Sequence, residues 1–402
     1  MKARQFLPDM REKPGLYLGI DATNIRQGGG VTHLSQLLQA GDPAVAGFDR
    51  VTVWTCKSTA ATLPDRPWLI KRSAPWMEAA LPMRMVGQQF RLPKDLAAVG
   101  CDVLFSPGGT LPNWCSLPTV TMSQNMLPFE PLEAARFGCF SPMRLKMRLL
   151  RHTQAHSFRR ADGIIFLTQY AATAVSKALA DVPSNLGLIP HGIEPRFIQA
   201  PRPQRWLADC SAQSPFRILY VSILMPYKHQ VEVAHAAKQL RSAGMPIEMR
   251  FIGSPWGGYG QQFRALLDEL DPKREFLLWS GAEPFDALHN CYQNADVFVF
   301  ASSCENLPNI LIEAMAAGLP IASSDRGPMP EVLGDAGVYF DPEVPASIAE
   351  ALSKLALDAS LRANLAGMAW RKAQAYSWER CAHDTFTFIA QVARGKLGTP
   401  NV

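Results

Sequence analysis

The chain contains 402 residues, of which 48% are hydrophobic and 19% are charged, and its formal net charge is +5. This length exceeds that of one ordinary core and predicts two domains. The composition excludes a long disordered tail, and no apolar run approaches the ~20 residues that span a bilayer. The eight cysteines are scattered without a CxxC pair. Because no signal-peptide pattern is apparent either, we expect a cytoplasmic chain with reduced thiols.

Short β-branched and aromatic runs alternate with amphipathic stretches, which is typical of parallel sheets covered by helices. The strands predicted in the first half are 16–21, 51–56, 103–106, 119–123, 163–168 and 186–190. Those predicted in the second half are 217–222, 247–253, 276–281, 297–302, 320–323 and 337–340. A polar, proline-containing stretch at 199–215 separates the two sets. We therefore predict an α/β fold with two doubly wound, Rossmann-like domains, 1–200 and 215–376, that face a cleft.

Two carboxylates occupy unusual positions in VFVFASSCENLPNILIEAMAAG, residues 297–318. Glu305 lies in the loop after a predicted strand, and Glu313 lies on the next helix beside Leu311 and Ile312. A glutamate in such apolar surroundings is unfavourable to bury without a partner. Both carboxylates therefore either accept hydrogen bonds from the hydroxyls of a ligand or are solvated charges.

The start of the same helix is a predicted anion site. Proline favours the first helical position, so the helix is expected to begin near Pro308. Unpaired N–H groups in its first turn, together with the helix dipole, would attract a diphosphate. The residues expected to line this site are Asn306, Leu307, Pro308 and Asn309.

The spacing Glu305-x7-Glu313, followed by EAMAAGLPIASS, Pro330-Glu331 and GDAGVYFDP, resembles glycosyltransferase family 4. Members of this family are retaining enzymes with the GT-B fold, and many bacterial members build cell-surface glycans. The resemblance implies that Glu305 contacts the transferred sugar and that Glu313 contacts the ribose of the donor. It further implies that 215–376 binds the nucleotide-sugar donor and 1–200 the acceptor, with a last helix, 377–398, crossing back to the first domain.

The segment VSILMPYKHQ, residues 221–230, resembles the family's loop that faces the donor diphosphate. Lys228 matches the family's lysine, and a fixed cation there would stabilise the leaving diphosphate. The usual arginine five residues earlier is replaced by Ile223, and Arg326 is the expected substitute. In FLLWSG, the backbone near Gly281 is expected to contact the base.

Three more loops resemble family segments. Gly29 and Gly30 would let the donor phosphates approach the backbone, although a flexible turn explains these glycines equally well. In SQNMLPFEP the residues expected on the acceptor side are Gln124, Asn125 and Glu130. In IPHGIEPRF we interpret His191 as structural.

The sequence contains no D-x-D pair, so we expect a metal-independent mechanism without a cofactor. Lys228, Glu305 and Glu313 are the predicted catalytic residues. The expected reaction moves a hexose from a UDP- or GDP-sugar to a lipid-linked or saccharide acceptor during lipopolysaccharide, capsule or exopolysaccharide synthesis. Two alternatives stay open: a non-catalytic protein that binds nucleotide sugars, and a GT-B sugar-nucleotide isomerase.

The segment from Arg136 to Arg160 contains seven Lys or Arg and no Asp or Glu. Four of its arginines fall on one helical stripe, namely Arg144, Arg148, Arg151 and Arg159. We interpret this stripe as a contact for an anionic membrane, at the inner face of the plasma membrane, and a solvated helix face is the alternative. Nucleic acid is not an expected partner, because aromatic stacking motifs are lacking.

Overall fold

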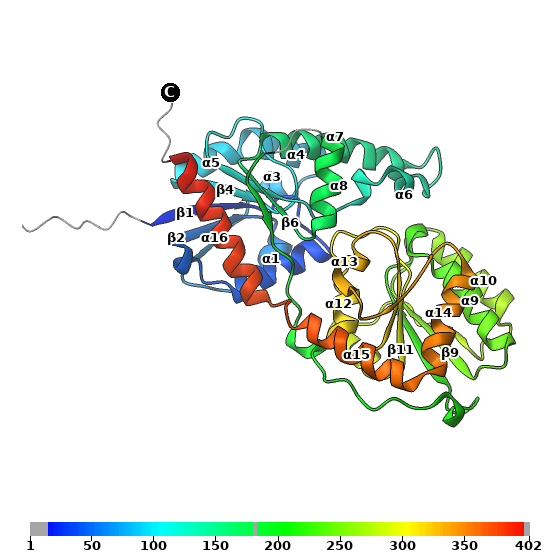
Figure 1. The fold of residues 1–402 in the computed structure, drawn as a ribbon. Coiled ribbons are helices and arrows are strands. Elements are labelled where there is room, and N and C mark those ends of the chain that lie inside the picture. Colours follow the sequence, from blue (N-terminus) through cyan, green and yellow to red (C-terminus); the bar gives the residue numbers. More distant parts are fainter. Residues whose placement is uncertain (1–14, 180–182, 398–402) are drawn as a thin grey trace, which may run out of the picture. The chain divides into compact units, whose positions relative to one another are not determined.

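A computed structural model describes residues 15–179 and 183–397 and contains two sheets flanked by helices (Figure 1). The first sheet has the strand order β3-β2-β1-β4-β5-β6-β7. Its strands are β1 Leu16–Asp21, β2 Phe48–Trp54, β3 Leu69–Arg72, β4 Val103–Ser106, β5 Thr119–Met122, β6 Gly163–Phe166 and β7 Leu186–Leu188. The accompanying helices are α1 Gly29–Ala40, α2 Lys57–Ala60, α3 Pro75–Glu78, α4 Leu81–Phe90, α5 Leu92–Val99, α6 Pro131–Ala135, α7 Pro142–Arg160 and α8 Gln169–Leu179.

The second sheet has the strand order β10-β9-β8-β11-β12-β13. Its strands are β8 Phe216–Val221, β9 Ile247–Ile252, β10 Leu277–Trp279, β11 Val297–Phe300, β12 Ile321–Ser324 and β13 Val338–Phe340. Its helices are α9 Gln230–Ser242, α10 Tyr259–Leu270, α11 Leu288–Gln293, α12 Asn309–Ala316, α13 Met329–Leu333, α14 Pro345–Leu357 and α15 Ala359–Ala373, and α16 Trp378–Leu397 ends the described chain. Helices α9, α10 and α14 pack beside this sheet, as Figure 1 shows.

The central strands pair in parallel and are buried on both faces. Every residue of β4, β6, β11 and β12 is buried, which explains why these strands are continuous apolar runs instead of alternating ones. The predicted α/β class with Rossmann-like parallel sheets is confirmed. One strand, β3, was not predicted. Its sequence LIKR is short and half polar, and β3 lies at the edge of its sheet with Arg72 exposed.

In each sheet the strand order reverses beside the first strand. In the second sheet, β8 pairs with β9 on one side and with β11 on the other. Loops that leave the carboxyl ends of such neighbouring strands diverge, and ligands of open α/β sheets bind between them. The loops after β8 and β11 are the ones that contain Lys228 and Glu305.

The chain forms two compact units. Unit 1 runs to Thr121 and also includes Ala161–Gly163 and the chain from Ala382 onward, and unit 2 is the remainder. Within unit 1, Phe386 of α16 packs edge-on against Phe48, with ring centroids 6.4 Å apart. The predicted domain bounds stay a prediction. The stretch 199–215 lies between β7, the last strand of the first sheet, and β8, the first strand of the second. The boundaries of the two units lie at other positions in the chain. Residue 398 of the predicted last helix lies outside the described residues.

The end of α12 packs closely against the connecting segment that leads toward β8. Gly318 has a φ of 67°, and a Cβ there would lie 2.7 Å from the backbone nitrogen of Pro201. The backbone N–H of Gln199 donates to the carbonyl of Ala316 at 2.9 Å. Position 318 therefore requires glycine for its left-handed backbone and for the close approach of this segment.

Candidate active site

Glu313 is buried on α12, with 8% of its surface exposed. The hydroxyl of Tyr292, on α11, donates a hydrogen bond to Oε2 of Glu313 at 2.8 Å. Burial raises the pKa of Glu313 to about 7, and the hydrogen bond from Tyr292 partly opposes this rise. The alternative of a solvated charge on the helix surface is therefore wrong for Glu313. The role of this carboxylate toward a ribose stays a prediction.

Lys228 and Glu305, which are 77 positions apart in the sequence, form an ion pair between Nζ and Oε1. Lys228 is buried in the short 3₁₀ helix Pro226–Lys228, and its Nζ lies 5.2 Å from the ring centroid of Tyr227 and 5.7 Å from that of Phe300. The pair forms because β8 and β11 are neighbours, so that the loops at their carboxyl ends meet. Two of the three predicted catalytic residues are therefore in direct contact.

A hydrogen-bond network adjoins this ion pair, and its residues were not predicted from the sequence. Nε2 of His229 contacts Oγ of Ser303 at 3.0 Å, and this hydroxyl donates to Oε2 of Glu133 at 2.5 Å. Glu133 is also paired with Arg136 at 2.7 Å, and Arg136 pairs with Glu343 at 2.5 Å. Since Ser303 has a single proton and donates it to Glu133, the ring nitrogen of His229 is the donor toward Ser303.

The start of α12 lies near Pro308, as predicted, but its hydrogen bonding differs from the prediction. Pro308 precedes the helix as its N-cap, with φ −79° and ψ 77°, and Asn309 is the first helical residue. The N–H of Asn309 donates to the carbonyl of Leu307 at 2.9 Å, and Leu311 and Ile312 both donate to Pro308. Of the N–H groups predicted for the anion site, that of Asn309 therefore has a partner. The helix is shortened by the ψ of Pro308, which is outside the helical region.

The two asparagines of this turn connect α12 to other loops of unit 2. The amide of Asn306 donates to the carbonyl of Ser123 at 2.9 Å, and the hydroxyl of Thr168 donates to the carbonyl of Asn306 at 2.9 Å. Nδ2 of Asn309 lies 3.4 Å from Nδ1 of His191. The loops after β5, β6 and β11 are thus joined through one residue, Asn306.

His191 is buried and stacks on Trp378, with ring centroids 5.6 Å apart. Burial lowers its pKa to about 4, so the imidazole is neutral at pH 7. A neutral, packed ring fits the structural interpretation of this residue.

The predicted acceptor-side residues lie in the segment between β5 and α6 and contact nearby groups. The amide of Gln124 lies 3.1 Å from the sulfur of Met122, and Oδ1 of Asn125 accepts from the N–H of Leu127 at 3.1 Å. Glu130 accepts a hydrogen bond from the hydroxyl of Tyr170. No contact of these residues identifies an acceptor, and their role stays a prediction.

The remaining predicted donor residues are less buried. Arg326 pairs with Asp341 at 2.8 Å and with Asp325 at 3.2 Å, so its positive charge is already balanced by two carboxylates. Gly281 has a φ of 80°, which favours glycine, and its carbonyl accepts from Gly253 at 2.7 Å. Gly29 and Gly30 begin α1 in unit 1, where Gly28 is the N-cap with a φ of 68°.

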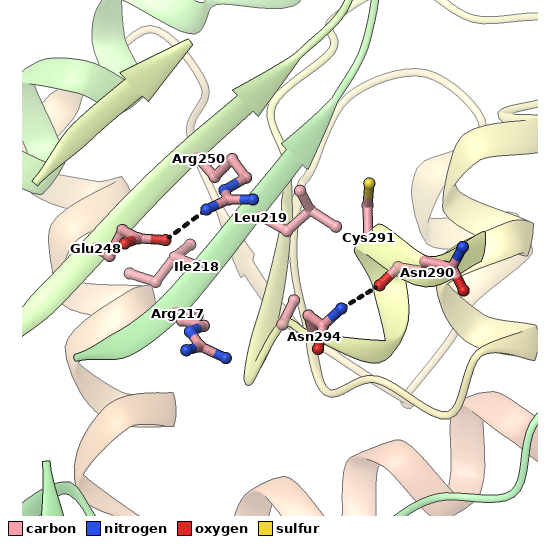
Figure 2. Close-up of a pocket in the computed structure, with 9 residues that line it drawn as sticks. Arg217, Ile218, Leu219, Glu248, Arg250, Asn290, Cys291 and Asn294 are labelled. Carbon is pink, nitrogen blue, oxygen red and sulfur yellow. Dashed lines mark hydrogen bonds and ion pairs between the residues drawn. The ribbon is translucent and has the colours of Figure 1, made fainter. Parts of the chain in front are cut away.

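A separate pocket of about 340 Å³ lies beside the beginning of β8 (Figure 2). Arg217, Glu248 and Arg250 project from strands β8 and β9 on one side, and Asn290 and Cys291 lie on α11 on the other. Lys228 and Glu305 instead follow the carboxyl ends of their strands. The pocket therefore differs from the predicted site.

Across 15–179 and 183–397, no group of three or more His, Cys, Asp or Glu is arranged to bind a metal ion. Within the same ranges, no helix has both the length and the apolar character needed to cross a membrane.

Solved structures define the class of fold. Sucrose-phosphate synthase from Thermosynechococcus elongatus matches with a TM-score of 0.72 at 16% identity, over 95% of this chain and 99% of that one. WaaG, a glycosyltransferase involved in lipopolysaccharide biosynthesis, matches with a TM-score of 0.68 at 16% identity, over 93% of this chain and 99% of that one. At these identities the likeness concerns the fold, and it confirms the predicted GT-B class.

The sequence of the second half is more specific. Residues 211–369 match the family described as "Glycosyl transferases group 1", and this segment, which contains Lys228, Glu305 and Glu313, is a domain of that family. An O-antigen chain mannosyltransferase B from Escherichia coli is 28% identical over 42% of this chain and 44% of its own length. Spore coat protein SA from Bacillus subtilis is 31% identical over 42% of this chain and 46% of its own length. The chain thus spans about half the length of these relatives.

Proposed function

We propose that this protein is a glycosyltransferase that moves a hexose from a UDP- or GDP-sugar to a lipid-linked or saccharide acceptor in surface-glycan synthesis. The observation that carries the proposal is the buried carboxylate of Glu313, held on an apolar helix within the segment that matches the group 1 glycosyltransferases. The name of the Escherichia coli relative, an O-antigen chain mannosyltransferase, supports the glycan context. An Anabaena protein of the same fold, with a TM-score of 0.66 and 16% identity, is described in complex with UDP-glucose.

The chemistry of the proposal follows from the charges of the site. Cleavage of the donor leaves a diphosphate whose negative charge grows in the transition state, and the ammonium of Lys228 would stabilise it. Glu305, now paired with Lys228, would then accept hydrogen bonds from sugar hydroxyls, and Glu313 from the ribose. Glu313 and Tyr292 would form one unit, because Tyr292 holds Oε2 and leaves Oε1 for the ribose. We further propose retention of the anomeric configuration and no metal requirement.

Ligand-dependent stabilisation tests the donor site. A panel of UDP- and GDP-sugars is screened by thermal unfolding, and a ligand present at ~100 times its Kd should add ~2.7 kcal/mol. The stabilising sugar nucleotide is then tested as a radiolabelled donor. Glu313→Gln should abolish the shift, whereas Glu350→Gln on the exposed side of α14 should retain it.

Two outcomes separate the alternatives. Stabilisation without transfer or hydrolysis of any donor would indicate a nucleotide-sugar-binding protein, and conversion of the donor without an acceptor would indicate an isomerase. If no UDP- or GDP-sugar changes the unfolding temperature, the proposal is wrong. The cytoplasmic location and the membrane contact through Arg144, Arg148, Arg151 and Arg159 of α7 stay predictions.

A further inference from the structure

Helix α4 has its apolar residues on the outside. Five large apolar side chains of this ten-residue helix are between 44% and 59% exposed, and they are Leu81, Met83, Met85, Val86 and Phe90. At 100° per residue they fall, with Pro82 and Gln89, on one continuous side of the helix. The opposite side contains Arg84, Gly87 and Gln88. A helix packed on a soluble core normally shows the reverse polarity.

The polar side of α4 is held firmly against unit 1. The buried amide of Gln88 donates to Oδ2 of Asp21, at the end of β1, at 2.5 Å. It also donates to the hydroxyl of Thr110 at 3.2 Å. Gly87 packs so closely on Trp76 that a Cβ would lie 2.1 Å from the indole ring. The helix therefore cannot rotate its apolar side inward without breaking a buried hydrogen-bond network.

The apolar surface continues beyond the helix. Trp114 is 65% exposed and stacks on Phe90, with ring centroids 5.0 Å apart. The loop that carries Trp114 is fixed to α4, because the backbone N–H of Asn113 donates to the side chain of Gln89 at 2.7 Å. We call Leu81, Met83, Met85, Val86, Phe90 and Trp114 the α4 surface. Contiguous exposed patches of this kind mark interaction sites.

The basic residues near the α4 surface favour an anionic partner. Between residues 79 and 94 the charged residues are Arg84, Arg91 and Lys94, and Glu78 and Asp95 flank this segment. Arg91 and Lys94 are exposed at the junction of α4 and α5. Helices that lie in the plane of a bilayer combine an apolar side rich in Met, Leu, Phe or Trp with basic residues that contact anionic headgroups. Trp and Phe are favourable at the depth where hydrocarbon meets headgroups.

We propose that the α4 surface docks on a membrane that contains anionic lipids, with Met83, Val86, Phe90 and Trp114 inserted among the acyl chains. This site lies in unit 1 and is distinct from the arginine stripe on α7, which was the membrane contact predicted from the sequence. The proposal does not rest on sugar transfer, because vesicle binding is measured without donor or acceptor.

The test is co-sedimentation of the full chain with vesicles of phosphatidylcholine, with and without phosphatidylglycerol. The protein should bind the anionic vesicles, and added NaCl should weaken binding. The double variant Met83→Ser/Val86→Ser should bind ~10-fold or more weakly, since it removes inserted apolar area. The control Val45→Ser/Leu357→Ser, which removes two other exposed apolar side chains, should bind like the parent.

A second measurement locates the surface in the bilayer. Brominated lipids should quench part of the tryptophan fluorescence, and Trp114→Phe should lose that part. Because the substituted side chains are exposed, the unfolding temperature of the double variant should match that of the parent, which separates lost binding from lost folding. Unchanged vesicle binding by Met83→Ser/Val86→Ser would overturn the proposal. So would a parent that does not bind vesicles but forms a dimer that this variant abolishes.

Discussion

The hydroxyl of Tyr292 donates a 2.8 Å hydrogen bond to Oε2 of Glu313, and both side chains are buried. The two residues lie on α11 and α12, the helices that precede and follow β11. Among the described residues, Tyr292 is the only hydrogen-bond donor recorded for this carboxylate. A single neutral donor is weak compensation for a buried charge. Glu313 is therefore poised between its charged and neutral forms.

The stability of the protein should depend on pH through Glu313. The pKa of Glu313 is about 7 in the folded chain, whereas an unperturbed glutamate has a pKa of 4.5. Between these values the folded protein holds a proton that the unfolded chain has lost, so the free energy of unfolding falls as pH rises and is level above the folded pKa. The loss should be up to ~3 kcal/mol. Glu313→Gln lacks this titrating group, so the variant should gain stability relative to the parent as pH rises from 5 to 8. Urea unfolding at a series of pH values over this range measures the difference.

The matched control is Glu350→Gln, whose carboxylate is exposed on α14. Its stability difference from the parent should not change over the same pH range. Parallel pH curves for the parent and Glu313→Gln would contradict the raised pKa.

Tyr292→Phe should raise the pKa of Glu313 further, because it removes the hydrogen bond that stabilises the charged form. The pH at which donor affinity is half-maximal should move upward, while the affinity at high pH falls only modestly. A purely structural role for Tyr292 would lower donor affinity equally at every pH. Calorimetric titration of the nucleotide at several pH values distinguishes the two outcomes.

Lys228 and Glu305 should be energetically coupled. Removing one partner of a largely buried ion pair leaves an uncompensated charge, so Lys228→Met and Glu305→Gln should each destabilise the protein by up to ~3 kcal/mol. The double variant should be less unstable than the sum of the two. Urea unfolding of all four proteins gives the coupling, and additive effects would show that the pair is not formed. In the proposed reaction, Lys228→Met should also lower kcat by ~10²-fold or more.

Glu331 should stabilise the start of α8. Its two carboxylate oxygens accept from the backbone N–H groups of Gln169 at 2.7 Å and Tyr170 at 2.8 Å. A carboxylate at a helix N-terminus interacts favourably with the helix dipole. Glu331→Gln should therefore destabilise the protein by ~1 kcal/mol, and the difference should shrink at high salt. A difference that is independent of salt would indicate that the charge contributes nothing.

The strand pattern of the fold was predictable because the buried strands of parallel sheets are uninterrupted apolar runs. In β11 this run, VFVF, is fully buried, and its position fixed where the loop with Glu305 begins. The strand β3 was not found because Lys71 and Arg72 interrupt its apolar character. The other edge strands, β7, β10 and β13, are more apolar than β3, and each of them was predicted.

The partners of the candidate site were harder to predict than its residues. Glu313 was recognisable as a carboxylate in an apolar helix, but its donor Tyr292 lies 21 positions away. Ser303 and Glu133 are 170 positions apart and meet only because of the tertiary fold. The start of α12 near Pro308 was predictable, but its backbone was not, since the preference of proline for the first helical position does not determine its ψ.

The close fit between Gly318 and the segment at Gln199 and Pro201 makes that segment a reporter of local unfolding. A protease needs several residues of extended, detached chain, and this stretch is attached to the end of α12 by the hydrogen bond from Gln199 to Ala316. Cleavage there would require the last turn of α12 to open first. Any ligand that tightens α12 should therefore slow nicking at this point, even though the cut bond lies outside the helix.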